Sequence, residues 1–407
     1  MFDDERFYSK LGKTFEPSVL TEVVLAAFEM VKQGKKLISL TGGSYDPASL
    51  PMEPIKAIFA EAPASAWQEM LQYGSNLGSG RLRAELCMFM RGEGVEANPE
   101  TEILVTTGSQ QALDLVSRIF IDPGDVIVVG SPTYLQALSA FRQFGPEFCL
   151  VPVDGEGMDT GALEAELKRL ASRGKPPKLL YLVPSFDNPT GAVMPMERRR
   201  AVLELAEEFD LLVLEDNPYG YISFEGSMPT PLRALDKSGR VMYTSTFSKI
   251  VSPGLRIGWI VAPKEFVTKM AEAKGNVDIC SDGLSQYAAA ELLRRGVVER
   301  QIPRITNVYR RKRDLMLEAI ETHFPRQAEW SEPKGGLFVW VKLPLDADTS
   351  KMLKEAVQSG VAYIPGSEFF VDPSIKNYLR LNYSFPSEDD IVEGITILGR
   401  LLKKHMS

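Results

Sequence analysis

The feature of this sequence that most constrains its fold is the alternation of short apolar runs with amphipathic helical patterns. Runs at six places are rich in Val, Ile and Leu and do not alternate with polar residues, which is typical of strands covered on both faces. They lie at 103–107, 126–130, 178–183, 211–215, 241–245 and 257–262. Between them, apolar residues recur at helical spacing, as at Ala112, Leu115, Val116 and Ile119 and again at Val202, Leu205, Ala206 and Phe209. The alternation predicts an α/β fold with a mainly parallel, helix-covered sheet, whose ligands bind beyond the carboxyl ends of the strands.

A different pattern occupies the last hundred residues. A long charged helix is expected around 307–324, and strands are expected at 335–342, 361–365 and 378–384. Strands clustered after a helix predict a smaller α+β domain. The amino-terminal segment has Leu20, Val23, Val24 and Ala27 on one face of a helix, and it is expected to pack with that domain or to cross the domain junction. The chain is therefore divided into an amino-terminal segment, a large domain and a small domain, at 1–50, 51–305 and 306–407.

The composition excludes several classes of protein. The chain has 407 residues, of which 44% are hydrophobic and 25% charged, as in an ordinary globular protein and unlike collagen-like, disordered or disulfide-framework chains. The formal net charge of −8 argues against nucleic acid or an anionic membrane as partner. The acidic start and the strand-sized apolar runs show no signal peptide or membrane span, so a cytoplasmic location is expected. With 3 cysteines far apart and 2 histidines, no metal site is expected, and acid–base chemistry must come from Lys, Tyr, Asp, Glu or a cofactor.

A lysine follows the strand expected at 241–245, in the segment Ser245-Thr-Phe-Ser-Lys249-Ile-Val-Ser-Pro-Gly-Leu-Arg256. Most loop lysines are simply solvated. Lys249 differs because the carboxyl end of a buried strand faces the usual ligand crevice, hydroxyl groups surround it, and Arg256 could share an anion with them. An amine in a partly desolvated, cationic neighbourhood has a lowered pKa and can attack a carbonyl group.

Polar residues follow three other strands as well. Asp216 ends the strand at 211–215 and could cap a turn or, if buried, pair with a cationic ring nitrogen, and Tyr219 could offer a phenol to the same ligand. Asn188 lies in Ser185-Phe-Asp-Asn-Pro-Thr-Gly191, which by itself is only a loop. The turn Gly108-Ser-Gln-Gln111 opens a helix, and exposed N–H groups at a helix start bind phosphate well. Each signal alone is weak.

Together these segments resemble the fold-type-I, pyridoxal-phosphate (PLP)-dependent aminotransferases of class I/II over essentially the whole chain. Gly-Ser-Gln-Gln, Asn-Pro-Thr-Gly, Asp-x-x-Tyr and Ser-Lys with Gly-Leu-Arg occur in the family's order. The segments around Asn188 and Lys249 look most like the 2-aminoadipate/aromatic branch, which includes kynurenine aminotransferases. The resemblance implies a large domain with a mainly parallel seven-stranded sheet between helices and a smaller α+β domain. It also implies transfer of an amino group from an aromatic, long apolar or 2-aminoadipate-like amino acid to a 2-oxo acid, such as 2-oxoglutarate, by a ping-pong mechanism.

The resemblance also implies roles for single residues. Lys249 would bind PLP covalently and later move the α-proton, while Asp216 would keep the ring nitrogen protonated. Asn188 and Tyr219 would hydrogen-bond the ring's 3-oxygen. Tyr134 would stack on the ring, although a tyrosine at a strand end can simply cover the core. The phosphate cup would consist of Ser109, Gln110, Thr246, Ser248 and Arg256.

Substrate binding and assembly involve residues outside these motifs. Arg380 matches the family arginine that binds the substrate α-carboxylate, although it could be the outward charge of a strand. Gly43 lies in a small-residue loop expected over the substrate, which Asn188 would also contact. Tyr73 resembles the tyrosine that reaches the PLP phosphate of a neighbouring subunit, which implies a homodimer.

Two alternative functions remain open from sequence. A PLP-dependent C–S lyase would share the same cofactor cup, and incubation with an amino acid alone would distinguish it by continued product release. A regulatory ligand-binding module would need a DNA-binding domain, for which the first hundred residues leave no room.

The amino-terminal helix bears on substrate choice. In this branch, an arginine there can bind a second carboxylate, and an ungapped comparison puts Thr21 at its position, beside Glu22. Threonine offers no charged fork, so an aromatic or long apolar substrate is expected. If the comparison slips, Arg6 or Lys13 could supply the missing cation.

Overall fold

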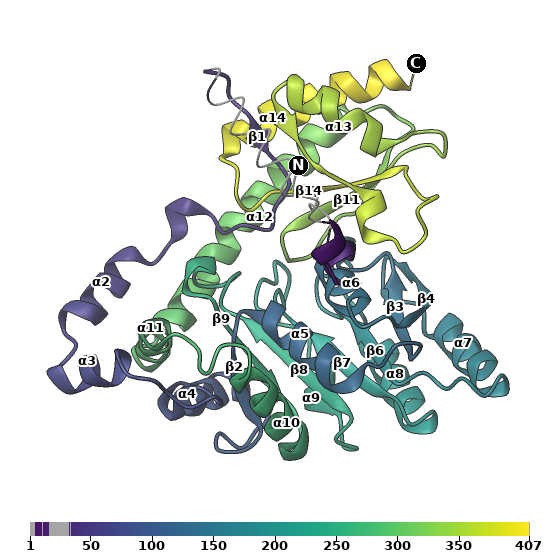
Figure 1. The fold of residues 1–407 in the computed structure, drawn as a ribbon. Helices are drawn as coiled ribbons and strands as arrows, with labels where there is room; N and C mark the ends of the chain where they lie inside the picture. Colours follow the sequence, from purple (N-terminus) through teal and green to yellow (C-terminus); the bar gives the residue numbers. More distant parts are fainter. Residues whose placement is uncertain (1–4, 10, 16–31, 33, 407) are drawn as a thin grey trace.

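An eight-stranded sheet forms the centre of the computed structural model, which describes residues 5–9, 11–15, 32 and 34–406 (Figure 1). Along the sheet the order is β2 (Ile103–Thr107), β9 (Ile257–Val261), β8 (Val241–Thr246), β7 (Leu212–Asp216), β6 (Leu179–Leu182), β3 (Val126–Ser131), β4 (Glu147–Asp154) and β5 (Gly157–Met158). Strand β9 runs antiparallel to β2 and β8, β5 runs antiparallel to β4, and the other neighbouring strands are parallel. The predicted mainly parallel sheet is confirmed, with the two-residue β5 as an eighth strand at its edge.

Helices cover both faces of this sheet. One face packs against α7 (Thr160–Ser172), α8 (Met196–Glu208) and α9 (Leu232–Leu235). The other packs against α4 (Gly80–Met90), α5 (Ser109–Phe120), α6 (Leu135–Arg142), α10 (Lys264–Gly275) and α11 (Gly283–Arg294). Alternate residues of a strand point to opposite faces, so Val128 and Leu180 join the first core while Ile127 and Leu179 join the second. Burial on both faces explains why these strands are continuous apolar runs in the sequence.

The small domain is built around a second sheet. Its antiparallel order is β10 (Glu329–Trp330), β11 (Phe338–Lys342), β14 (Tyr378–Asn382) and β13 (Ile364–Pro365), and it is accompanied by α13 (Thr349–Gln358) and α14 (Glu388–His405). The amino-terminal strand β1 (Ile38–Ser39) pairs in parallel with β12 (Val361–Ala362) of the same domain. The helix face expected at Leu20 to Ala27 lies outside the described residues.

Two elements differ from expectation. Strand β4 was not predicted, although its residues Phe148 to Val151 form an apolar run; Pro152 interrupts that run, and only Cys149 and Val151 of the strand are fully buried. Helix α12 (Val297–His323) begins well before the expected residue 307. It contains Pro303, a residue that usually ends or kinks a helix. Because α12 passes unbroken through residue 305, it links the two parts of the chain, and the division there stays a prediction.

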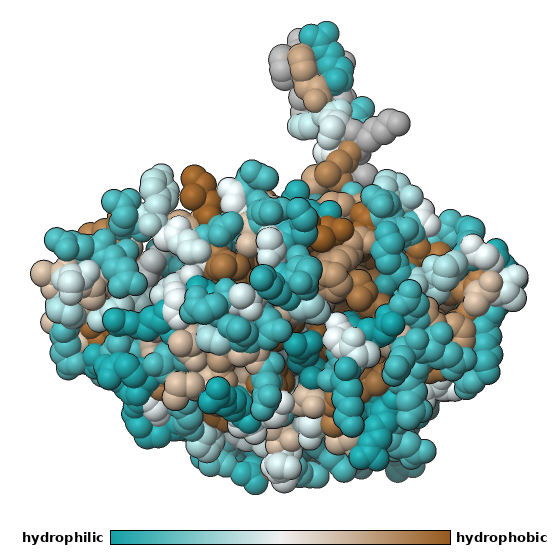
Figure 2. Space-filling view, turned by 90° about the horizontal axis from the view of Figure 1, so that it is seen from below, coloured by the Kyte–Doolittle hydropathy of each residue, from teal (hydrophilic) through white to brown (hydrophobic). Residues whose placement is uncertain are grey.

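Two further helices connect the amino-terminal segment to the large domain. Helices α2 (Met52–Ala60) and α3 (Ala64–Met70) pack against α11 and lead from the amino-terminal segment to α4 (Figure 1). Hydrophilic side chains cover most of the face in Figure 2, with apolar ones scattered among them. None of the helices that the structure describes has the length and apolar content needed to cross a membrane.

Candidate active site

The predicted site residues meet where the carboxyl ends of β6, β7 and β8 approach β14 of the small domain. Asn188 follows β6, Asp216 ends β7, Lys249 follows β8, and Arg380 lies within β14. They line two adjoining cavities, the larger of about 400 Å³. The residues shared by both cavities are Tyr134, Asn188, Tyr219 and Lys249. The fold thus brings together residues separated by almost two hundred positions in the sequence.

Lys249 has the properties of a nucleophilic amine. Its Nζ donates a hydrogen bond to the backbone oxygen of Gly43 at 2.7 Å. Burial and the nearby guanidinium groups of Arg380 and Arg256 lower the pKa of Lys249 to about 8, against the opposing effect of Asp216. An amine with that pKa is partly unprotonated near neutral pH, so it can attack an aldehyde. At Gly43 a Cβ would lie 2.8 Å from Cζ of Phe338, so glycine is required for this close approach.

Asp216 is buried with only one of its oxygens satisfied. The hydroxyl of Tyr181 donates to Oδ2 at 3.0 Å, whereas Oδ1 has no hydrogen-bond partner. Burial raises the pKa of Asp216 to about 7. An unpaired carboxylate oxygen at a cavity wall is costly unless a ligand supplies a donor. A protonated ring nitrogen is such a donor, so this residue fits the pyridine nitrogen of PLP.

Arg380 is a buried cation linked to the same cavity. Its Nη1 donates to Oδ1 of Asn188 at 2.8 Å, and Nδ2 of Asn188 donates to the hydroxyl of Tyr219 at 3.2 Å. The guanidinium lies between the rings of Phe338 and Phe369, at 4.1 and 4.9 Å from their centroids. Burial lowers the pKa of Arg380 to about 10, so it still carries its charge at neutral pH. Within the described part of the chain no carboxylate pairs with it, which leaves this cation available for an anionic substrate group.

The turn before α5 forms a cradle for an anion. Gly108 has a φ of 71°, and a Cβ there would lie 2.4 Å from Nη2 of Arg256. A Cβ on Gly258 would lie 2.5 Å from the backbone nitrogen of Ser109. Arg256 also donates to Oγ of Ser248 at 3.4 Å. The start of α5 and this guanidinium therefore place N–H donors side by side, which is the arrangement that binds phosphate.

Other predicted cup residues already have partners within the chain. The hydroxyls of Thr246 and Ser248 are 2.9 Å apart. Nε2 of Gln110 donates to the backbone oxygen of Gln136 at 3.2 Å, and the hydroxyl of Tyr134 donates to the Gln136 side chain. In this arrangement one N–H of the Gln110 side-chain amide is engaged, so Gln110 can offer a phosphate its backbone N–H and the second N–H of that amide.

Tyr73 is not brought into this cavity. Its side chain is 77% exposed, and it lines neither cavity of its own chain.

The structure also adds residues that sequence reasoning missed, namely Tyr181, Phe338 and Thr41. A hydroxyl within the apolar run 178–183 is a usable signal for Tyr181. Thr41 accepts a hydrogen bond from Arg380 through its backbone oxygen, which leaves no trace in the sequence.

The fit of these groups to PLP, on a mainly parallel sheet joined to a small α+β domain, defines the class of protein as a fold-type-I, PLP-dependent enzyme. Its family follows from comparison with known proteins: the model for aminotransferase class I and II matches residues 35–398. The chain belongs to this family and is a PLP-dependent aminotransferase.

Several relatives match over nearly their whole length. The aromatic-amino-acid aminotransferase 1 of Thermococcus litoralis is 41% identical over 99% of this chain and 96% of its own. The 2-aminoadipate transaminase of Thermus thermophilus is 38% identical over 90% of each chain. The crystal structure of the Pyrococcus horikoshii kynurenine aminotransferase, in complex with PMP, KYN as substrates and KYA as products, has a TM-score of 0.94 and 41% identity over 100% of this chain and 99% of that one. The predicted family resemblance is confirmed, and the alternative of a purely regulatory module is set aside.

Proposed function

We propose that this aminotransferase transfers the amino group of an aromatic, long apolar or 2-aminoadipate-like amino acid to 2-oxoglutarate in ping-pong half-reactions. The observation that carries the proposal is the buried guanidinium of Arg380, which has no carboxylate partner among the described residues and lines one cavity with Lys249. An α-carboxylate on Arg380 would hold an amino acid with its α-carbon near that amine. The names of the relatives from Thermococcus, Thermus and Pyrococcus support this range of substrates.

The walls of the larger cavity favour an aromatic or apolar side chain. Among the described residues that line it, the charged ones are Lys249 and Arg380, and both already have roles. Leu135, Phe338 and Phe385 provide apolar surface. A second carboxylate would therefore lack a cation within this lining, which disfavours 2-aminoadipate as donor. 2-Oxoglutarate would still bind through its α-carboxylate on Arg380, with its second carboxylate held by adaptable loop contacts. Thr21, on which the sequence argument depends, lies outside the described residues.

Each residue of the candidate site has a separate role in the proposed reaction. When bound, PLP withdraws electrons from the α-carbon of the amino acid, and Asp216 supports this by keeping the ring nitrogen protonated. Lys249 holds the cofactor covalently and, once released, accepts the α-proton at Nζ and returns it. Asn188 and Tyr219 orient the ring through its 3-oxygen, and Tyr134 covers one ring face. The phosphate is held by Ser109, Gln110, Thr246, Ser248 and Arg256.

A second subunit completes the site in this proposal. Tyr73 is largely exposed on its own chain, yet hydrogen-bonding to phosphate would require it to be near a cofactor. A homodimer in which the hydroxyl of Tyr73 reaches the neighbouring phosphate satisfies both conditions.

The experiment compares kcat/KM for phenylalanine, kynurenine, leucine and 2-aminoadipate with 2-oxoglutarate as the common acceptor. We expect the aromatic donors to exceed 2-aminoadipate by at least about tenfold, the discrimination that one missing charged contact produces. A clear preference for 2-aminoadipate would contradict the reading of the cavity. Incubation with amino acid alone separates the lyase alternative, because a transaminase stops after one equivalent of 2-oxo acid per site.

A further inference from the structure

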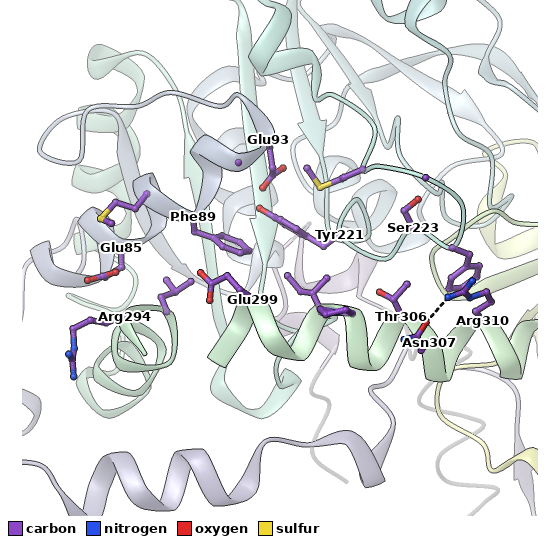
Figure 3. A pocket seen from close by; sticks show the side chains of 18 residues that line it. Glu85, Phe89, Glu93, Tyr221, Ser223, Arg294, Glu299, Thr306, Asn307 and Arg310 are labelled. Atoms are coloured by element: carbon purple, nitrogen blue, oxygen red, sulfur yellow. Dashed lines mark hydrogen bonds between the residues drawn. The ribbon is translucent and has the colours of Figure 1, made fainter. Parts of the chain in front are cut away.

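A second cavity, of about 930 Å³, lies between α4, α12 and the loop 221–228 (Figure 3). It shares no lining residue with the two cavities of the active site. The stacked rings of Phe89 and Tyr221, with centroids 4.8 Å apart, form part of its wall, and Phe224 and Ile302 add further apolar surface. Its size and aromatic lining are those of a small-molecule site. We call it the α4–α12 groove.

Three buried polar atoms along the groove have no hydrogen-bond partner. They are Oε1 of Glu93, the hydroxyl of Tyr221 and Oγ1 of Thr306. Glu93 is only 6% exposed and Thr306 only 8%. Figure 3 shows the carboxyl group of Glu93 and the hydroxyl of Tyr221 near each other at the middle of the groove, with Thr306 on α12. Unpaired buried polar atoms are rare in folded proteins, and a cluster of them beside a cavity indicates a missing ligand.

The charges of the groove favour a cation. Glu85, Glu93 and Glu299 all line it, and within the described part of the chain none of the three forms an ion pair within 4 Å. Of the two arginines in its lining, Arg294 is held by Glu291 at 2.6 Å, and Arg310 donates to Asn307 at 2.5 Å. Burial raises the pKa of Glu93 well above its usual range, against the opposing effect of the hydrogen bond from Tyr243, and the negative charge of Glu215 raises it further.

The carboxyl group of Glu93 is fixed in place from its other side. The hydroxyl of Tyr243 donates to its Oε2 at 3.1 Å, and Nδ2 of Asn217 donates to that hydroxyl at 3.1 Å. Asn217 in turn accepts a hydrogen bond from the backbone of Gly220 at 3.2 Å. Oε1 is therefore the free end of a rigid chain of hydrogen bonds, and binding a donor there costs little reorganisation.

We propose that the α4–α12 groove is an accessory binding site for a small organic amine, whose ammonium group pairs with Glu93 and whose aromatic or apolar body packs on Phe89 and Tyr221. A protonated amine supplies both the charge and the N–H donors that Glu93, Tyr221 and Thr306 lack. A carboxylate ligand is disfavoured because it would meet three glutamates, and of the two arginines in the lining Arg294 is already paired with Glu291, which leaves only the exposed Arg310 to attract it. This inference does not depend on the substrate proposed for the active site.

The test measures binding of N,N-dimethyl-2-phenylethylamine to the PLP-loaded enzyme by calorimetry. A tertiary amine cannot condense with the aldehyde of PLP, so covalent binding at the active site is excluded. We expect saturable binding of one molecule per chain, at least tenfold weaker for 2-phenylethanol, which has the same body without the charge. 3-Phenylpropionate, whose carboxylate suits Arg380, should not displace the amine.

Variants assign the binding to the groove. Glu93→Gln keeps the acceptor for Tyr243 but removes the charge, and we expect it to weaken amine binding at least tenfold. Glu204→Gln, an exposed glutamate on α8, is the matched control and should leave binding unchanged. If Glu93→Gln does not fold, Thr306→Val and Tyr221→Phe test the other unpaired groups, with about threefold weaker binding expected for each. Absence of saturable binding, equal affinity in these groove variants and the wild type, or displacement by 3-phenylpropionate would overturn the proposal.

Discussion

Replacing Asp216 by asparagine should change catalysis and stability in opposite directions. Burial raises the pKa of Asp216 from its ordinary 3.8 to about 7. One pKa unit corresponds to about 1.4 kcal/mol, so ionising this carboxyl in the PLP-free protein costs up to about 4 kcal/mol of folding free energy. Because the folded pKa lies above the unfolded one, the cost is absent below about pH 4 and grows as the pH rises towards 7.

Asparagine has the same shape, can still accept the hydrogen bond of Tyr181, and cannot ionise. Urea unfolding of the PLP-free proteins measures the free energy of unfolding. The value for Asp216→Asn should exceed that of the wild type by an amount that increases by about 2–4 kcal/mol between pH 4 and 7. Asp346→Asn, at an exposed carboxylate, is the control and should show no such rise.

The same variant should lose activity when PLP is present. Asparagine cannot keep the ring nitrogen protonated, and the loss of a buried charge pair of about 3–4 kcal/mol corresponds to a fall in kcat of about 10²–10³-fold. Turnover would be measured with an aromatic donor and 2-oxoglutarate. Near-normal kcat, or a stability difference that does not vary with pH, would refute the reasoning.

Three further perturbations test the other parts of the site. Lys249→Ala should retain PLP non-covalently but lose transamination, and absorbance spectra with and without an amino donor would check this; turnover at the wild-type rate would exclude Lys249 as the catalytic amine. Arg380→Gln should lower kcat/KM by about 10²–10³-fold, since a buried charged contact is worth about 3–4 kcal/mol, whereas its effect on PLP absorbance should be small. For Tyr73, we expect Tyr73→Phe to bind PLP several-fold more weakly in equilibrium dialysis. Mixing the impaired variant Tyr73→Ala with Lys249→Ala should give more activity than the sum of the two alone if each site uses both subunits, and a mixture with no more activity than its parts would argue against the shared site.

Most strands of the large sheet could be predicted from the sequence, because a strand buried on both faces consists of a continuous run of apolar residues. The strands at β2, β3, β6, β7, β8 and β9 were predicted to within a residue or two at each end, since a strand between two helix layers must be apolar throughout. Local sequence rules argue against two elements that the structure forms, because Pro152, a residue disfavoured within strands, lies in β4, and Pro303, a residue disfavoured within helices, lies in α12.

The candidate site was predictable where chemistry requires a particular side chain. Lys249, Asp216 and Arg380 were expected and do lie together. Contacts made through the backbone, such as those of Thr41 and Gly43, leave almost no signal because any residue carries the same carbonyl oxygen. The unpaired oxygen of Glu93 could not be foreseen either, since it depends on packing between α4, α12 and the loop 221–228.

The short stretch from β1 to Gly43 has a mechanical consequence. It is hydrogen-bonded to the small domain at three places, since Ile38 and Leu40 donate to β12 and its flanking turn and Asn382 donates to Leu40. A few residues further on, its backbone oxygen at Gly43 accepts the hydrogen bond of Lys249 in the large domain. A movement of the small domain away from the large one would therefore be expected to carry this stretch with it and to lengthen the hydrogen bond between the Gly43 carbonyl and Nζ of Lys249. The distance between the two domains would thus determine whether Nζ of Lys249 keeps its hydrogen bond to the backbone of the amino-terminal stretch.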